Sequence, residues 1–250
     1  MKVRFFRLRD TRLPLPLGFL IFLLVLSLIC SALGYFAGLS LPAAPSLQDE
    51  PTLRDFTVVL DAGHGGEDGG AVSDAGIFEK DLNLEIAFLV KEILEACSVK
   101  VVMTRTEDIL LYDRNVDFQG RKKALDLAAR RKIAEETENA IFVSIHMNAY
   151  PLKQYSGLQV WHSRDNEIAQ KMAKNLQSTA KFHLQPENNR QVKPTTSSIY
   201  LLHHLTCPAV LVECGFLSND AEAERLADAS YQRELAFVIA YSIIASQTNS

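Results

Sequence analysis

Four side chains that could carry out metal-assisted hydrolysis stand at the edges of predicted secondary structure. His64 lies in a glycine-rich run after a short β-rich segment, and His146 and Glu213 each follow a buried apolar run. Glu79 opens a helical pattern after the glycine-rich loop. Two imidazoles and a carboxylate form a known zinc set that leaves a coordination position for water or substrate. A further, non-ligating carboxylate beside that water can act as general base. The residue types therefore predict a hydrolytic metal site and leave open which carboxylate is the base.

Each of these residues also has a simpler structural explanation when it is taken alone. A histidine beside glycines is more often a turn or capping residue than a ligand, because glycines permit tight turns. An acid such as Glu79 stabilises any helix N-terminus. Glu213 is harder to explain in this way, because a carboxylate at the end of a buried strand needs a partner or water. The coincidence of all four near strand ends is what favours a functional site.

The four residues can meet only if the intervening elements bring the strand ends together. Apolar and β-branched runs predict strands, and apolar residues at helical spacing predict helices. The expected strands span 57–60, 99–104, 141–145, 157–161 and 209–212, and the expected helices span 79–97, 124–137, 167–182 and 231–245, with one further helix capped by Ser218 or Asn219. This alternation predicts an α/β domain with a largely parallel sheet flanked by helices on both faces. In such sheets functional residues gather beyond the carboxyl ends of the strands, where Glu79 could also reach.

The N-terminal part of the chain has a different composition. Residues 17–41 are nearly unbroken apolar sequence without charge, long enough to cross a bilayer at about 1.5 Å per residue. Residues 1–16 carry five basic side chains against one acid, and basic flanks of this kind stay in the cytoplasm. We therefore expect one transmembrane helix in the cytoplasmic membrane, a linker over 42–55, and a catalytic domain over 56–250 on the extracytoplasmic side. A cleaved signal peptide is the alternative, because Ala32-Leu33-Gly34 has small residues at cleavage-like spacing.

Charge and motif content argue against several other classes of function. Five of the 26 basic residues and one of the 30 acidic residues precede residue 17, so the remainder carries 21 against 29, a net charge of −8. This balance argues against nucleic acid as a partner. The chain has neither a His-Glu-x-x-His motif nor a Gly-x-Ser-x-Gly elbow. Cys214 could act as a nucleophile with His203 or His204, but a buried free thiol is the more common state of such a cysteine.

Four segments resemble one enzyme family in their order and spacing. They are Val58–Gly66, Glu79–Leu84, Ser144–Ala149 and Pro208–Asn219. Together they are similar to the zinc-dependent N-acetylmuramoyl-L-alanine amidases, the catalytic type 3 family, and the resemblance runs from about Thr57 to the C-terminus. It implies a twisted sheet flanked by helices, one zinc ion bound by His64, Glu79 and His146, and Glu213 as the catalytic carboxylate. The chain departs from the family at Glu135, where Asn is usual.

The resemblance also implies a substrate and a reaction. Zinc-activated water would cleave the amide bond between the lactyl group of N-acetylmuramic acid and L-alanine in peptidoglycan. Tyr200–His203 and the long loop before Arg121 resemble the spore-cortex branch of the family, which acts in sporulating bacteria. Two alternatives stay open: a non-catalytic peptidoglycan-binding scaffold on the same fold, and a zinc peptidase acting on stem peptides. The sequence does not indicate which protein, if any, activates the enzyme.

Overall fold

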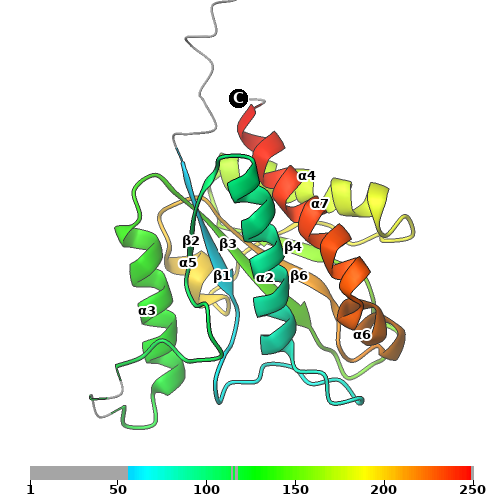
Figure 1. The fold of residues 1–250 in the computed structure, drawn as a ribbon, viewed down its shortest axis with the longest axis horizontal. Helices are drawn as coiled ribbons and strands as arrows, with labels where there is room; N and C mark the ends of the chain where they lie inside the picture. The colour runs from blue at the N-terminus through cyan, green and yellow to red at the C-terminus, as the bar shows by residue number, and fades with distance from the viewer. Residues whose placement is uncertain (1–55, 114, 116–117, 249–250) are drawn as a thin grey trace, which may run out of the picture. The chain divides into compact units, whose positions relative to one another are not determined.

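A six-stranded sheet forms the centre of the domain in the computed structural model, which describes residues 56–113, 115 and 118–248 (Figure 1). The strand order is β2-β1-β3-β6-β4-β5. The strands are β1 (Thr57–Ala62), β2 (Lys100–Met103), β3 (Ala140–Asn148), β4 (Gln159–His162), β5 (Lys193–Pro194) and β6 (Ala209–Phe216). The sheet is mixed, because β4 runs antiparallel to β6 while the other pairings are parallel. The predicted α/β class is confirmed.

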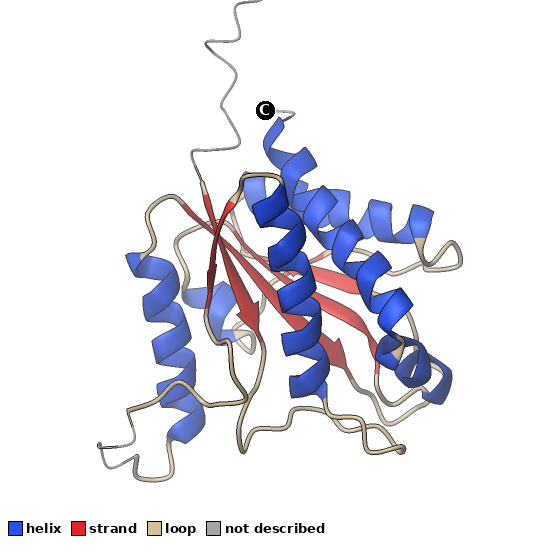
Figure 2. Cartoon of the chain, viewed as in Figure 1, coloured by secondary structure: helices blue, strands red, loops and turns tan. Residues whose placement is uncertain are grey.

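Helices cover both faces of the sheet (Figure 2). They are α2 (Glu79–Ala96), α3 (Lys122–Glu136), α4 (Glu167–His183), α5 (Tyr200–His204), α6 (Asp220–Ala227) and α7 (Ala229–Thr248). Because successive strand residues point to opposite faces, β1 contributes Val58 and Leu60 to the apolar layer beneath α2, α4 and α7. Val59 belongs to the other layer, which α3 and α5 cover. The flanking helices on both faces were predicted, and this too is confirmed.

Three strands, β1, β3 and β6, are longer than the sequence pattern predicted. β3 continues to Asn148 and β6 to Phe216, so His146 and Glu213 lie within strands and not after them. Both strands continue through these polar residues because the parallel ladder pairs His146 with Glu213 before the register shifts. The prediction ended each strand at its last apolar residue, where a polar side chain on one face interrupts the pattern. The short elements β5 and α5 were not predicted.

Helix α3 packs against the sheet mainly through buried ion pairs, and less through apolar contacts. Its buried residues are Asp126, Arg130 and Ala134. The Arg130 guanidinium, 1% exposed, donates to Asp61 Oδ1 at 2.7 Å and to Asp126 Oδ2 at 2.8 Å. Burial alone would raise the pKa of Asp61, but Arg130 and a hydrogen bond from Ser144 outweigh it and hold the pKa below its usual value. The pair therefore stays ionised inside the protein.

The expected N-terminal segments 1–16, 17–41 and 42–55 lie outside the described residues. Within the part of the chain that is described, no helix is both long enough and apolar enough to span a membrane.

We expect Arg130→Met to destabilise the domain by roughly 3–5 kcal/mol, because removing one partner of a buried pair leaves an uncompensated charge. Urea unfolding followed by the fluorescence of Trp161, the single tryptophan, measures this. Arg131→Met is the matched control, since Arg131 pairs with Glu135 at the surface, and its unfolding midpoint should barely move. Equal shifts of the unfolding midpoint in the two variants would contradict a structural role for the buried ion pair.

Candidate active site

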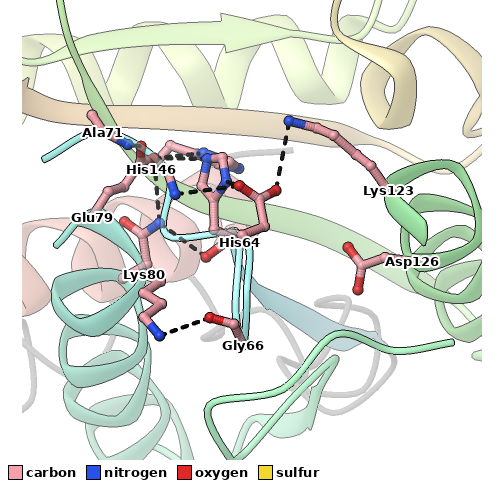
Figure 3. Close-up of polar contacts among 12 residues, drawn as sticks. His64, Gly66, Ala71, Glu79, Lys80, Lys123, Asp126 and His146 are labelled. Carbon is pink, nitrogen blue, oxygen red and sulfur yellow. Dashed lines mark hydrogen bonds and ion pairs between the residues drawn. The ribbon is translucent and has the colours of Figure 1, made fainter. Parts of the chain in front are cut away.

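Three predicted ligands converge at the carboxyl end of the sheet. One ligand atom from each of His64, Glu79 and His146 lies within 4.8 Å of the others. Glu79 Oε1 is 3.3 Å from His64 Nε2 and 2.9 Å from His146 Nδ1 (Figure 3). Two imidazole nitrogens and a carboxylate oxygen are the ligand types that zinc takes in catalytic sites with one position left open. The donor set therefore fits a zinc ion.

Glu79 is held in place at the first turn of α2. The side chain is 3% exposed, and its two oxygens accept hydrogen bonds from the backbone N–H groups of Ala71, at 2.8 Å, and Met147, at 3.0 Å. Burial disfavours the charged form, but hydrogen bonds to His146 and His64 outweigh it and hold the pKa of Glu79 far below its usual value. Glu79 is thus more than an acid placed at a helix N-terminus, because a buried carboxylate faces both imidazoles.

Glycines let the backbone approach these ligands closely. A Cβ atom at Gly63 would lie 2.3 Å from the His146 ring, so any larger residue would displace the imidazole. Gly70 has φ of +68°, and a Cβ atom there would lie 2.5 Å from Glu79 Oε2. The sequence suggested that glycines of this loop serve a tight turn. At Gly63 the requirement is space for a ligand.

Two arginines, neither of them predicted, fix the loop that carries His64. Arg130 donates to the carbonyl oxygens of Ala62 at 2.7 Å and His64 at 2.6 Å. Arg105 donates to the carbonyl oxygens of Ala62 at 2.8 Å and Gly63 at 3.1 Å. His64 itself has φ of +62°, an uncommon conformation for a residue with a side chain. The guanidinium groups hold the backbone in this conformation and so aim the imidazole. The signal for Arg130 in the sequence was a helix rich in alanine and arginine.

Glu213 lies beside the three ligands. It pairs with His146 in the parallel register of β3 and β6, and both side chains line the same cleft. Its Oε2 atom is buried and has no hydrogen-bond partner. Burial raises the pKa of Glu213 to about 7. A buried carboxylate oxygen without a partner suits a proton acceptor near neutral pH.

The cleft beside the ligands is bounded by two helices. From α3 come Lys123, Asp126 and Leu127, and from the other side come residues 198–201 at the start of α5. Asp68, which was not predicted as a site residue, also lines the cleft and places Oδ1 2.9 Å from His64 Nδ1. Since Nε2 of the same ring faces Glu79, Asp68 approaches the other nitrogen, at an ion-pair distance but without hydrogen-bond geometry.

The cysteine alternative is not supported by the geometry. Cys214 is fully buried and belongs to the apolar layer on the α2 side, opposite to the face that carries Glu213. Burial raises the pKa of its thiol well above the usual value. His203 and His204 are exposed on α5. The expectation that Cys214 is a buried free thiol is confirmed.

The chain belongs to the N-acetylmuramoyl-L-alanine amidase family, whose sequence model matches residues 58–245. The germination-specific N-acetylmuramoyl-L-alanine amidase of Bacillus subtilis is 37% identical over 187 residues, which are 75% of this chain and 78% of that protein. The CwlD amidase of Clostridioides difficile, solved in complex with the GerS lipoprotein, is 36% identical with a TM-score of 0.74 over 78% of this chain and 100% of that one. AmiC2 of Nostoc punctiforme is 31% identical, with a TM-score of 0.64 over 76% of this chain and 96% of that one. The predicted family is confirmed.

We expect Asp68→Asn to weaken zinc binding by roughly 10- to 100-fold, because a carboxylate on the second nitrogen of a ligating histidine orients the ring and raises its basicity. Competition with a chromophoric chelator measures the dissociation constant directly. Asp74→Asn is the matched control, since Asp74 lies in the following loop and pairs with Lys153 at the surface. Unchanged zinc affinity in Asp68→Asn would show that Asp68 does not position His64.

Proposed function

We propose that this protein is a zinc-dependent peptidoglycan amidase that hydrolyses the bond between the lactyl group of N-acetylmuramic acid and L-alanine. One observation carries the proposal: His64, Glu79 and His146 converge beside Glu213, whose buried Oε2 lacks a partner. Membership of the amidase family supports the substrate.

In this proposal His64, Glu79 and His146 would hold one zinc ion. When bound, zinc supplies a Lewis acid and lowers the pKa of water in the site. Glu213 accepts the proton of the attacking water on its free oxygen and returns it to the departing amine of L-alanine. The buried and unpartnered Oε2 atom suits both steps, because it is free to take up the proton and to release it. Gly63 keeps space for His146, and Arg130 and Arg105 hold the His64 loop.

The two alternatives make different demands on the site. A non-catalytic scaffold has no need of a complete ligand set with an unpartnered carboxylate beside it, so the convergence of all four residues favours the enzyme. A zinc peptidase would use the same groups on a stem-peptide bond. The products separate it from an amidase, because only the amidase leaves an intact stem peptide with a free L-alanine amine.

The cellular setting is also a proposal. We infer that residues 17–41 anchor the protein by a single pass in the cytoplasmic membrane, with the domain on the extracytoplasmic side and its substrate in the wall. The germination-specific relative from Bacillus subtilis supports the spore cortex as the substrate and sporulation as the setting. The complex of CwlD with a lipoprotein supports a partner protein of that kind for this chain.

We expect the wild-type chain with zinc to release intact stem peptides from purified peptidoglycan, identified by mass spectrometry. Glu213→Gln keeps nearly the same shape and removes the base, so it should retain zinc while release slows by about 10²- to 10⁴-fold. Glu224→Gln, on the first turns of α6, is the control and should behave as the wild type. Cleavage within the stem peptide would favour the peptidase, and near-normal release by Glu213→Gln would place the base elsewhere.

We expect protease added to intact, wall-stripped cells to digest the domain, because the basic flank over residues 1–16 retains the N-terminus in the cytoplasm. A cytosolic marker protein should survive the same treatment. A protected domain that fractionates with the cytosol would contradict both the topology and the access to peptidoglycan. Release of a shortened soluble form would identify the N-terminal segment as a cleaved signal peptide.

A further inference from the structure

The cleft beside the ligands is rich in acids and has one exposed cation among its described lining residues. Asp61, Asp68, Asp126 and Glu213 line it, together with the cations Arg130 and Lys123. Arg130 is 1% exposed and is already bound to Asp61 and Asp126, so it has no role at the surface of the cleft. The Lys123 side chain is 69% exposed. An anionic group that enters this cleft can therefore be met by Lys123.

The ion pair between Lys123 and Asp68 is weak enough for Lys123 to bind a different anion in its place. Its Nζ atom lies 3.6 Å from Asp68 Oδ2, and Figure 3 shows the side chain reaching from α3 toward His64. Exposed ion pairs of this length contribute little, and an ammonium group has three donors to share. The neighbouring Lys122 is differently placed, because it binds Glu67 at 2.7 Å and lies over the Phe118 ring.

The stem peptide of peptidoglycan presents an anion close to the scissile bond. Its second residue is a glutamate joined through the side-chain carboxyl, so the α-carboxylate is free. Extended peptide advances roughly 3.5 Å per residue, which puts this carboxylate about 7 Å beyond the scissile carbonyl. Lys123 contacts Asp68, and Asp68 lies 2.9 Å from His64. Asp68 therefore lies between the ammonium group of Lys123 and a proposed zinc ligand.

The uncharged residues of the cleft have a different character. Ser198, Ile199, Tyr200 and Leu201 line it with hydroxyl and apolar groups and bring no charge. An uncharged muramoyl sugar suits these residues, whereas a peptide arm with a carboxylate suits Lys123.

We propose that Lys123 binds the free α-carboxylate of the second stem-peptide residue and so selects stems in which this carboxylate is not amidated. The inference rests on the proposed amidase function. Lys123 then determines specificity on the peptide side of the scissile bond.

The test uses two fluorescent muropeptides that differ only in whether this carboxylate is free or amidated. Their dissociation constants are measured with the full zinc-loaded chain carrying Glu213→Gln, so that binding is seen without turnover. We expect the free carboxylate to bind on the order of tenfold more tightly, the size of one charge-assisted hydrogen bond. Lys123→Gln in the same background should abolish this preference, and Lys123→Arg should retain most of it.

Lys132→Gln is the matched control, because Lys132 is an exposed lysine on the same helix that pairs with Glu136 away from the cleft. It should keep the full preference, and zinc content should be equal in all variants. Equal binding of the two muropeptides, or a preference that survives Lys123→Gln, would overturn the proposal. A preference that depends on Lys123 in a chain that releases no stem peptide would uphold this inference and refute the proposed function.

Discussion

A buried carboxylate between two imidazoles is the constraint on which this structure depends. Glu79 is 3% exposed, and its Oε1 atom faces both His64 and His146. The partly buried Glu213 places a second carboxylate beside the same groups, with one buried oxygen atom unpartnered. Two acids shielded from water at one point are costly unless positive charge lies between or beside them. A zinc ion held by the three proposed ligands would supply that charge. The need for positive charge beside Glu79 and Glu213 is therefore also the reason to expect a metal ion, on which the proposed chemistry depends.

The surrounding fold serves to hold this cluster rigidly. The parallel pairing of β1, β3 and β6 brings the His64 loop, His146 and Glu213 to one edge, and α2 brings Glu79 to it from the following helix. The buried Arg130 joins α3 to β1 and also binds the carbonyl oxygen of His64. One side chain thus couples the packing of a helix to the direction of a ligand. The same helix carries Lys123 into the cleft, so α3 supports both the wall proposed to bind substrate and the proposed metal site.

The sequence allowed most of this arrangement to be predicted, for reasons that differ between residues. His64, His146 and Glu213 could be found because parallel strands end at one edge, so residues far apart in the chain are placed together by topology alone. The ends of β3 and β6 were missed because polar side chains on one face interrupt the apolar pattern while the ladder continues. Arg130, Arg105 and Asp68 were missed because their roles depend on individual contacts, and charged residues in a helix or loop usually face solvent. The close approach at Gly63 depends on the position of His146, which no local pattern reveals.

The most direct test of the central claim is the location of the metal. Anomalous diffraction at the zinc edge, from crystals of the full chain grown with zinc, gives the position of the ion and its ligand distances. The account predicts one zinc ion at about 2.0–2.2 Å from His64 Nε2, Glu79 Oε1 and His146 Nδ1, with Glu213 nearby and not coordinated. A zinc ion bound directly by Glu213, or one held by residues outside this cluster, would contradict it.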